Sequence, residues 1–459
     1  MAGTGAILTL SAIGKQDEFL TTSNVQDSFW AWRSVKHTPF TLFYRSRPLF
    51  RNQSPDSNWP FGSTITFKIN PKTSGDVLTN CYLKLTLPKG NNYCDQIGNA
   101  LIKDYSFMVG EQNIQTVPGD WNVIHDELYA SNTERFAKNF LINGGSPLGT
   151  VPPTSNDVNV YVPLNFFFSR YKTVTPGNWK NNRTTGNETN SADTFKSYFL
   201  MCACTQQFLY VQITFNPVTF FSDAGSISLE KVQLVTEEAT LSDEEVAYYN
   251  SNPQKLVYNT VQRQPVFRLD KGEGVKNSGS VTSGCPSLYK DQLITNIPVK
   301  AFHWFIRDQR YEDENDNTYY LNRYNFSSNP TATPYTEAYN QILSDARIFI
   351  NGESQLGFLE TLSPPFTNTT GANYFRFVVP STHGYSSPNR NIYTYSFSLN
   401  PREPTPSGAL NFNVVDSSKT YINGHVLVTA TSNTYNVNTH YIGYTILKYE
   451  NDVCTLLFM

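Results

Sequence analysis

Few residues in this 459-residue chain are spaced for catalysis or for binding a cofactor. The sequence has no Gly-x-Ser-x-Gly elbow, no GxxxxGK[ST] or GxGxxG phosphate loop and no HExxH zinc motif. We therefore expect no enzyme, no catalytic residue, no cofactor and no metal site. The histidines form no pair at the spacing of metal ligands, and they are His37, His125, His303, His383, His425 and His440.

One acidic stretch imitates the beginning of a calcium-binding loop. Asp313, Asn315 and Asn317 alternate as the first ligands of such a loop do. The sixth position is Thr318 where the loop needs glycine, and the twelfth is Tyr324 where it needs glutamate. The stretch is therefore predicted to be a solvated acidic loop.

The cysteines are too sparse to form a disulfide framework for so long a chain. Cys202 and Cys204 are predicted to share one face of a strand, but no CxxC pair or nearby histidine completes a zinc site. We expect buried free thiols. The six positions are Cys81, Cys94, Cys202, Cys204, Cys285 and Cys454.

Five Asn-x-Ser/Thr sequons are candidate glycosylation sites, and most lie in long polar stretches that are expected to be surface loops. These stretches cover residues 176–191, 307–329 and 363–372. A cytosolic chain would not meet the glycosylation machinery, so the sequons serve only as predicted surface markers. They are Asn52, Asn182, Asn187, Asn325 and Asn368.

Composition and charge narrow the class of protein. The net charge is −3 and no run of Lys or Arg occurs, so direct binding to nucleic acid is not expected. Neither a signal peptide nor an apolar run of about 20 residues is visible, which predicts a soluble protein made in the cytosol. Abundant Tyr, Phe, Thr, Asn and Pro favour strands and turns over helices.

Alternating apolar and polar residues predict half-buried strands throughout the chain. In the first half the pattern covers residues 65–69, 81–87, 105–109, 158–162 and 209–215. In the second half it covers residues 299–306, 346–350, 374–379, 392–399, 410–415 and 425–430. Asn351-Gly352 predicts a tight turn, and residues 107–111 resemble residues 349–353, which suggests two copies of one sandwich.

A proline-rich corner joins two of these strands. Alternation through residues 393–399 stops at Pro401, Pro404 and Pro406 and resumes at Leu410. We expect the chain to pass from one sheet to the other at this corner.

Two helices are predicted. Residues 121–129 have helical spacing, with Asp120 as the expected cap and His125 as a core histidine on the apolar face. Ser242 and Glu245 have the spacing of a capping box, which predicts a short helix ending before Pro253.

Several segments resemble the major capsid proteins of nucleocytoplasmic large DNA viruses, in the order of that family. The most specific is Tyr-Ser-Phe-Ser-Leu-Asn-Pro at 395–401, followed by Pro-Ser-Gly-Ala-Leu-Asn-Phe at 406–412. Gly-Asp-Trp at 119–121, Val-Pro-Leu-Asn-Phe-Phe-Phe at 162–168 and Arg-Ile-Phe-Ile-Asn-Gly at 347–352 also match. Residues 401–406 are richer in proline than the usual form, and residues 413–416 depart from the commoner Ser-Arg-Ile-Asp.

The resemblance implies an all-β chain of two tandem eight-stranded antiparallel jelly-roll β-sandwiches with a few short helices. The expected divisions are an arm at 1–24, jelly rolls at 25–235 and 263–459, and a helical connector at 236–262. It also implies a homotrimeric, pseudo-hexagonal capsomer that contacts neighbouring capsomers and minor capsid proteins. Such a protein belongs to the virion capsid, is assembled in the host cytoplasm and has an inner viral membrane nearby at most.

Two alternatives stay open at this point. The chain is either a minor or penton-associated capsid component, or a carbohydrate-binding β-sandwich that stacks aromatic residues on sugars. Paired carboxylates for glycoside cleavage are not excluded by spacing, since their separation is spatial. The acidic residues, however, cluster in presumed loops and in the connector.

Overall fold

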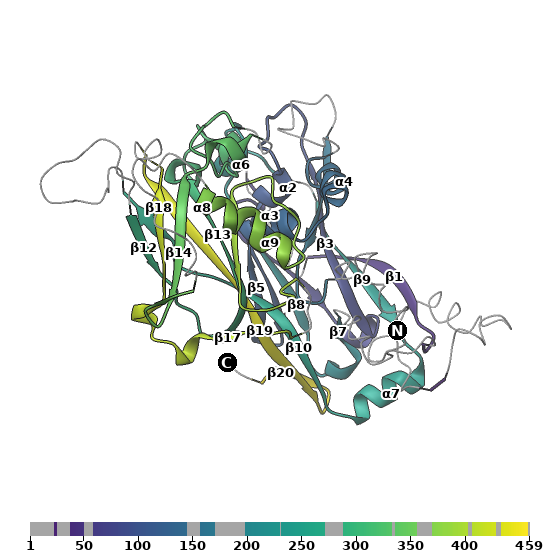
Figure 1. Ribbon diagram of the computed structural model, residues 1–459. Coiled ribbons are helices and arrows are strands. Elements are labelled where there is room, and N and C mark those ends of the chain that lie inside the picture. Colours follow the sequence, from purple (N-terminus) through teal and green to yellow (C-terminus); the bar gives the residue numbers. More distant parts are fainter. Residues whose placement is uncertain are drawn as a thin grey trace, which may run out of the picture.

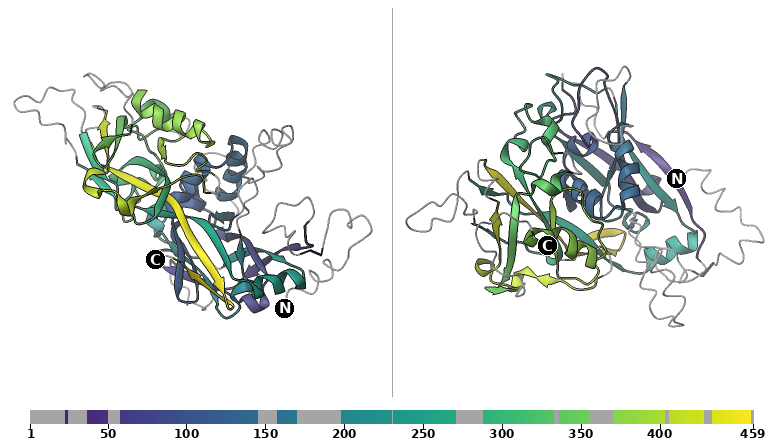
Figure 2. Two further views of the ribbon diagram at one scale, coloured as in Figure 1. Left: turned by 60° about the horizontal axis from the view of Figure 1, so that its bottom comes forward. Right: turned by 45° about the horizontal axis from the view of Figure 1, so that its top comes forward.

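The computed structural model describes the chain in eleven stretches, and the gaps between them are not discussed further. The described residues are 23–24, 37–49, 58–144, 157–169, 198–229, 231–270, 288–332, 336–355, 370–402, 406–427 and 433–457. Antiparallel sheets dominate, with a few short helices (Figures 1 and 2).

Two sheets form the first half of the chain. One has the order β1-β9-β3-β6 with β7 beside β3, and the other has the order β2-β8-β4-β5. The strands predicted for this half are all confirmed. Their bounds are β1 (Thr41–Arg47), β2 (Thr64–Ile69), β3 (Val77–Leu87), β4 (Ile102–Val109), β5 (Gln112–Pro118), β6 (Val158–Leu164), β7 (Phe199–Leu200), β8 (Leu209–Phe215) and β9 (Val232–Thr240).

Two further sheets form the second half. One has the order β10-β19-β13-β16, extended by β11, β17 and β20, and the other has the order β12-β18-β14-β15. The bounds are β10 (Gln254–Arg263), β11 (Phe267–Leu269), β12 (Leu288–Gln292), β13 (Pro298–Asp308), β14 (Leu343–Ile350), β15 (Glu353–Ser354), β16 (Ile392–Ser396), β17 (Leu410–Asn411), β18 (Tyr421–Val426), β19 (Tyr435–Glu450) and β20 (Val453–Leu456).

The two halves repeat one topology. We count in chain order only the strands on these paths, without β7, β11, β17 and β20. Each half then has its first, last, third and sixth strands in one sheet and its second, seventh, fourth and fifth strands in the other. This crossing order is that of a jelly roll, so the predicted pair of jelly-roll sandwiches is confirmed. A register shift also recurs at the same place, between Leu78 and Asn80 on β3 and between Val299 and Ala301 on β13.

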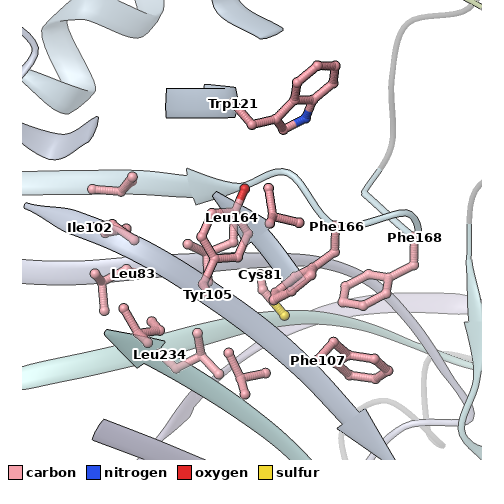
Figure 3. Packing of buried hydrophobic residues seen from close by; sticks show 14 of the residues in the cluster. Cys81, Leu83, Ile102, Tyr105, Phe107, Trp121, Leu164, Phe166, Phe168 and Leu234 are labelled. Atoms are coloured by element: carbon pink, nitrogen blue, oxygen red, sulfur yellow. The ribbon is translucent and has the colours of Figure 1, made fainter. Parts of the chain in front are cut away.

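Alternation along the strands builds the core. Leu83 on β3, Phe107 on β4 and Leu234 on β9 are fully buried, because each lies on the inner face of its sheet. Phe166 and Phe168 follow β6 and fill the space beside Phe107 (Figure 3). A second cluster fills the other sandwich, while the first cluster also includes second-half residues. The two cores therefore meet.

Short helices connect the strands at the ends of the sandwiches. The main ones are α3 (Gly119–Leu128), α4 (Asn132–Ile142) and α7 (Asp243–Ser251), and α2 (Ile97–Ala100), α6 (Val218–Phe221), α8 (Thr370–Asn373) and α9 (Val379–Thr382) have one turn each. Ser242 caps α7 by accepting from the Glu245 backbone N–H, as predicted. α7 lies within 236–262, while the residues on either side of it belong to β9 and β10.

The predicted strand at 374–379 is wrong. Residues Tyr374–Val378 form a π-helix that continues into α9. The alternation of Phe375 and Phe377 is misleading because Arg376 between them is buried, while Phe377 is only half-buried. Its guanidinium donates to Asn391 and to the Asn389 carbonyl, which a strand with alternating faces would not allow.

The proline corner also differs from the prediction. β16 ends at Ser396, whose hydroxyl donates to the Ser398 carbonyl. β17 stops at Asn411 and a 3-10 turn follows, so Val414 is exposed rather than core-facing. β16 and β17 both pair with β13, and the corner therefore returns the chain to the same sheet.

Two smaller expectations need correction, and a third is confirmed. Cys202 and Cys204 lie in a 3-10 helix rather than on a strand face. The strand expected at 425–430 begins earlier, since β18 covers Tyr421–Val426, and residues 428–430 lie outside the described residues. The Asn351-Gly352 turn between β14 and β15 is confirmed, with positive φ at both residues.

The start of α3 offers a test of the fold, because the helix approaches β4 too closely for a side chain. A Cβ added to Gly119 would lie 2.0 Å from the Ile102 carbonyl oxygen. We expect Gly119→Ala to lower the free energy of unfolding by about 2 kcal/mol or more, as other strained core substitutions do. Gly225→Ala is the control, since a Cβ there meets nothing within 4 Å. Equal urea midpoints for the two variants would contradict the close packing.

Candidate functional site

The most elaborate arrangement of polar groups lies where the two sandwiches meet, which we call the seam. In the seam α3 of the first half packs on β13 and the neighbouring turns of the second half. The Trp121 ring centroid lies 5.9 Å from that of His303, and the Tyr129 and Tyr385 centroids are 5.2 Å apart. The Ser386 backbone N–H also donates to the Leu128 carbonyl. Aromatic contacts therefore join the halves.

A buried ion-pair chain crosses the seam at the start of α3. Arg307 on β13 donates to both carboxylate oxygens of Asp120, at 3.2 and 3.3 Å, and to Glu312 at 2.9 Å. Burial alone would lower the pKa of Arg307, but the two carboxylates raise it above its usual value. Asp120 was predicted to cap α3, and this is wrong, because the cap position is Pro118. Asp120 instead binds the other sandwich.

A second buried guanidinium joins three carboxylates at the other end of α3. Arg390 lies 3.0 Å from Asp95 and 3.1 Å from Glu337, and its Nε lies 3.9 Å from Glu127. Glu127 also pairs with Arg135 of α4 at 2.7 Å. Burial raises the pKa of Glu337 to about 7 against the opposing effect of Arg390. The cluster ties α3 and α4 to the loops before β14 and β16.

A third guanidinium holds backbone carbonyls. Arg323 donates to the carbonyls of Thr219 and Phe220 in the first half, at 3.1 and 2.6 Å. It also donates to three carbonyls of its own loop, those of Tyr311, Asp313 and Asp316, at 3.1, 2.9 and 2.5 Å. All five N–H donors of the arginine are used. Burial lowers the pKa of Arg323 to about 10, and backbone oxygens accept every N–H that it offers.

Three histidines are buried on or beside α3. His125 stacks on Tyr129 with centroids 4.7 Å apart, and it lies in the core as predicted. The Nδ1 atom of His303 lies 2.8 Å from the Thr394 hydroxyl, and His440 is its register partner on β19. Burial lowers the pKa of His125 to about 4, and those of His303 and His440 to about 3. All three are neutral at pH 7.

The sequence-predicted site residues do not come together in the seam. In the loop that imitates a calcium site, the backbone carbonyl of Asp313 accepts a hydrogen bond from Arg323. Among the sequons only Asn325 is described, and it is buried rather than a surface marker. Its amide donates to the Asn329 carbonyl and accepts from Ser327. Asn52, Asn182, Asn187 and Asn368 lie outside the described residues.

The cysteines follow the predicted pattern where they are described. Cys81, Cys94, Cys202, Cys204 and Cys454 are free and buried, and Cys285 lies outside the described residues. Burial raises the pKa of these thiols above their usual value. Within the described stretches, no three or more His, Cys, Asp or Glu side chains are grouped to hold a metal ion. No helix in those stretches is both long and apolar enough to cross a bilayer.

The seam residues were missed by the sequence analysis, because the ion pairs that cross from one half to the other join positions far apart in the chain. Asp120 and Arg307, for instance, are 187 residues apart. The only local signal is a charged residue inside an apolar stretch, as for Arg307 at the end of β13. Chemically, the seam consists of charges neutralised by one another and by backbone groups. Such an arrangement fixes the position of one sandwich relative to the other and favours a structural role for the seam.

Arg323 provides a test of the seam. Arg323→Lys keeps the charge but cannot reach five carbonyls, and each buried polar group left unsatisfied costs about 1–3 kcal/mol. We expect the free energy of unfolding to fall by about 3 kcal/mol or more in urea titrations. Arg310→Lys is the matched control, since the Arg310 side chain is 47% exposed beside Asp308. A loss that is no larger at Arg323 than at Arg310 would contradict this role.

The buried histidines predict acid sensitivity. Their pKa values are depressed in the folded state, so the unfolded state binds more protons below pH 6.5. Stability is therefore full above pH 6.5 and falls as the pH drops toward 3, by at most about 1.4 kcal/mol per pH unit for each histidine. His303→Asn should reduce this slope, because one of the three depressed imidazoles is then missing. Urea unfolding at pH 7, 6, 5 and 4 measures the slopes, and identical slopes for wild type and His303→Asn would refute the assignment.

Comparison with known proteins assigns the chain to a family. Residues 37–176 match a model described as "Major capsid protein N-terminus", and residues 273–451 match one described as "Large eukaryotic DNA virus major capsid protein". The major capsid protein of Phaeocystis pouchetii virus is 22% identical, with 97% of each chain covered. That of Paramecium bursaria Chlorella virus 1 is also 22% identical, over 90% of this chain and 86% of the relative.

Solved structures show the same fold. VP54 of PBCV-1 superposes with a TM-score of 0.68 at 18% identity, covering 94% of this chain and all of that one. The Faustovirus major capsid protein superposes with a TM-score of 0.61 at 11% identity, with 91% of each chain covered. The two family models together match most of the sequence, in the order of the two sandwiches. The chain belongs to the family of large eukaryotic DNA virus major capsid proteins.

Proposed function

We propose that the protein forms homotrimeric, pseudo-hexagonal capsomers that tile the icosahedral shell of a large double-stranded DNA virus. The observation that carries this is the repetition of one topology in both halves of the chain. Two similar blocks per chain give six blocks per trimer, which approximates a hexagon with only three identical subunits. Hexagonal units fill a flat face without gaps, and closed symmetry leaves few open edges.

In this proposal each sandwich is one eight-stranded jelly roll. The first covers residues 25–235 and the second covers 263–459, with the connector at 236–262 centred on α7. β9, the last strand of the first sandwich, ends just before α7, and β10, the first strand of the second sandwich, begins just after it. This supports a division of the chain at α7. The proposed capsomer contacts neighbouring capsomers and minor capsid proteins. Of residues 1–24, which were expected to form an arm, 1–22 lie outside the described residues.

The role is structural, without catalysis. The charged groups buried in the seam are bound to one another or to backbone oxygens, an arrangement that supports rigidity. The many tyrosines do not favour the alternative of a sugar-binding sandwich, since many are core residues, such as Tyr105, Tyr393 and Tyr441. Assembly takes place in the host cytoplasm, without direct contact to nucleic acid.

The oligomeric state tests the proposal. Size-exclusion chromatography with light scattering should give three times the chain mass of 51.9 kDa. Negative-stain electron microscopy of the same fraction should show three-fold particles with a near-hexagonal outline. A monomer that binds glycans would refute the proposal. Copy number in purified particles separates the major role from that of a minor or penton-associated component, since a major protein is the most abundant one of the shell.

A further inference from the structure

Two histidine rings lie on neighbouring strands inside the seam. His303 on β13 and His440 on β19 are register partners, and both side chains are fully buried. Trp121 of α3 lies against His303 with ring centroids 5.9 Å apart, and the Tyr385 ring meets His303 edge-on at 5.4 Å. Phe305 stacks beside His440 with centroids 5.9 Å apart. The histidine pair therefore belongs to the contact between the two sandwiches.

Most of the nitrogen atoms of this pair lack a hydrogen bond. Among the described residues, no partner is found for Nε2 of His303 or for Nδ1 and Nε2 of His440. The remaining nitrogen, Nδ1 of His303, lies 2.8 Å from the Thr394 hydroxyl. Buried polar groups are rarely left unsatisfied, and each exception needs an explanation. Protonation makes both nitrogens of a ring donors, so it would add N–H groups that find no acceptor among these residues.

The charges near His440 are already matched. Arg263, its register partner on β10, and Arg307 on β13 both oppose a positive charge on the ring. Asp120 of α3 favours such a charge, but Arg307 binds both of its oxygens, at 3.2 and 3.3 Å, and Arg263 lies 4.0 Å from it. Glu312 is likewise bound by Arg307 at 2.9 Å. A proton on His440 would therefore add a charge that these two acids, paired with two arginines, do not match.

The groups around His303 do not favour a positive charge either. Lys300 on its own strand and the neighbouring ring on β19 both oppose protonation of His303. α3 faces it with Trp121, the turn before β16 with Tyr385, and β16 with Thr394, all of which are uncharged at acidic and neutral pH. Protonation of both rings would place two positive charges on adjacent strands.

Protons therefore bind the open seam more tightly than the closed one. Burial, the largest effect, lowers the pKa of His303 and of His440 to about 3, whereas an imidazole in water has a pKa of about 6.5. The closed seam is favoured in full above pH 6.5, and this advantage is lost as the pH falls toward 3. Between pH 7 and pH 5 the equilibrium constant for opening rises by about 25-fold for each ring that reaches water.

The seam can open without breaking a sheet, because no strand of one sandwich pairs with a strand of the other within the described residues. We propose that His303 and His440 make the seam acid-sensitive, so that it is closed at neutral pH and opens when the pair is protonated, while both sandwiches stay folded. The inference concerns a single chain and goes beyond the proposed capsomer. Since a shell needs blocks of fixed orientation, a shell built from this chain would loosen in acid.

Hydrogen exchange followed by mass spectrometry tests the seam at pH 7 and pH 5, after correction for the intrinsic pH dependence of exchange. The probe is segment 386–389, whose amides cross the seam. Ser386 donates to the Leu128 carbonyl at 2.8 Å, and Asn389 donates to Glu127 at 2.7 Å. The reference is β8, an interior strand of the β2-β8-β4-β5 sheet. From pH 7 to pH 5 we expect the protection of the probe to fall by about 600-fold, with β8 still better protected.

Substitutions assign the effect to the pair. In His303→Asn and in His440→Asn one ring is missing, so the protection of the probe should fall by only about 25-fold over the same pH range. His425→Asn on β18, in the other sheet of the second sandwich, is the matched control and should leave the wild-type fall unchanged. Urea midpoints at pH 7 show that the variants are folded. If an Asn variant does not fold, the wild-type comparison of probe and β8 still decides.

Three results would overturn the proposal. Equal protection of the probe and of β8 at pH 5 would show that the seam opens only when the whole chain unfolds. Unchanged protection of the probe between pH 7 and pH 5 would show that the seam does not respond to acid. The same fall in wild type and in both folded Asn variants would assign the response to other groups. None of these results bears on the capsomer, which the oligomeric state tests separately.

Discussion

Burial of arginine side chains between the two sandwiches is the constraint on which the rest of the structure depends. A guanidinium removed from water must keep its hydrogen bonds, or its burial becomes very costly. Arg323 satisfies this requirement only when its own loop and residues 219–220 of the other sandwich are both in place. Arg307 and Arg390 impose the same condition through Asp120 and through Asp95. The two sandwiches therefore form one unit with a fixed relative orientation, as a building block of a regular shell requires.

Part of this structure could be predicted from the sequence, because burial of one sheet face leaves a local pattern. The strands around Leu83 and Phe107 were found in this way, and the residues near 395–412 indicated the family and thereby the fold. Alternation failed at Phe375 and Phe377, where the buried side chain between them is Arg376, held by Asn391. A period of two cannot reveal a buried charge whose partner lies elsewhere in the chain.

The seam was beyond prediction for a related reason. The pairs that join the two sandwiches, such as Asp120 with Arg307 and Asp95 with Arg390, come from opposite halves of the chain, and a single sequence gives no information on which acid meets which base. Asp120 shows the difficulty, since its position before a helix predicts a cap, whereas tertiary contact with Arg307 determines its actual role. The resemblance to a family indicated that two sandwiches exist, but it did not indicate which residues hold them together.

Two sandwiches of one topology need not carry the same side chains on the sheet face that points away from the core. Whether that face is covered within the folded chain explains the difference. The contact within the chain forms during folding, so its residues never need to be soluble in the finished subunit. His303 and Phe305 can therefore be fully buried there. A contact between chains forms only after each subunit has folded and diffused, and its surface must first tolerate water. The register shift that β3 and β13 share puts Tyr82 and Lys84 in the places of His303 and Phe305, and these two residues are only half-buried. The internal repeat thus gives both sandwiches one topology, while the side chains on the sheet face that points away from each core differ, and only in the second sandwich are they fully buried.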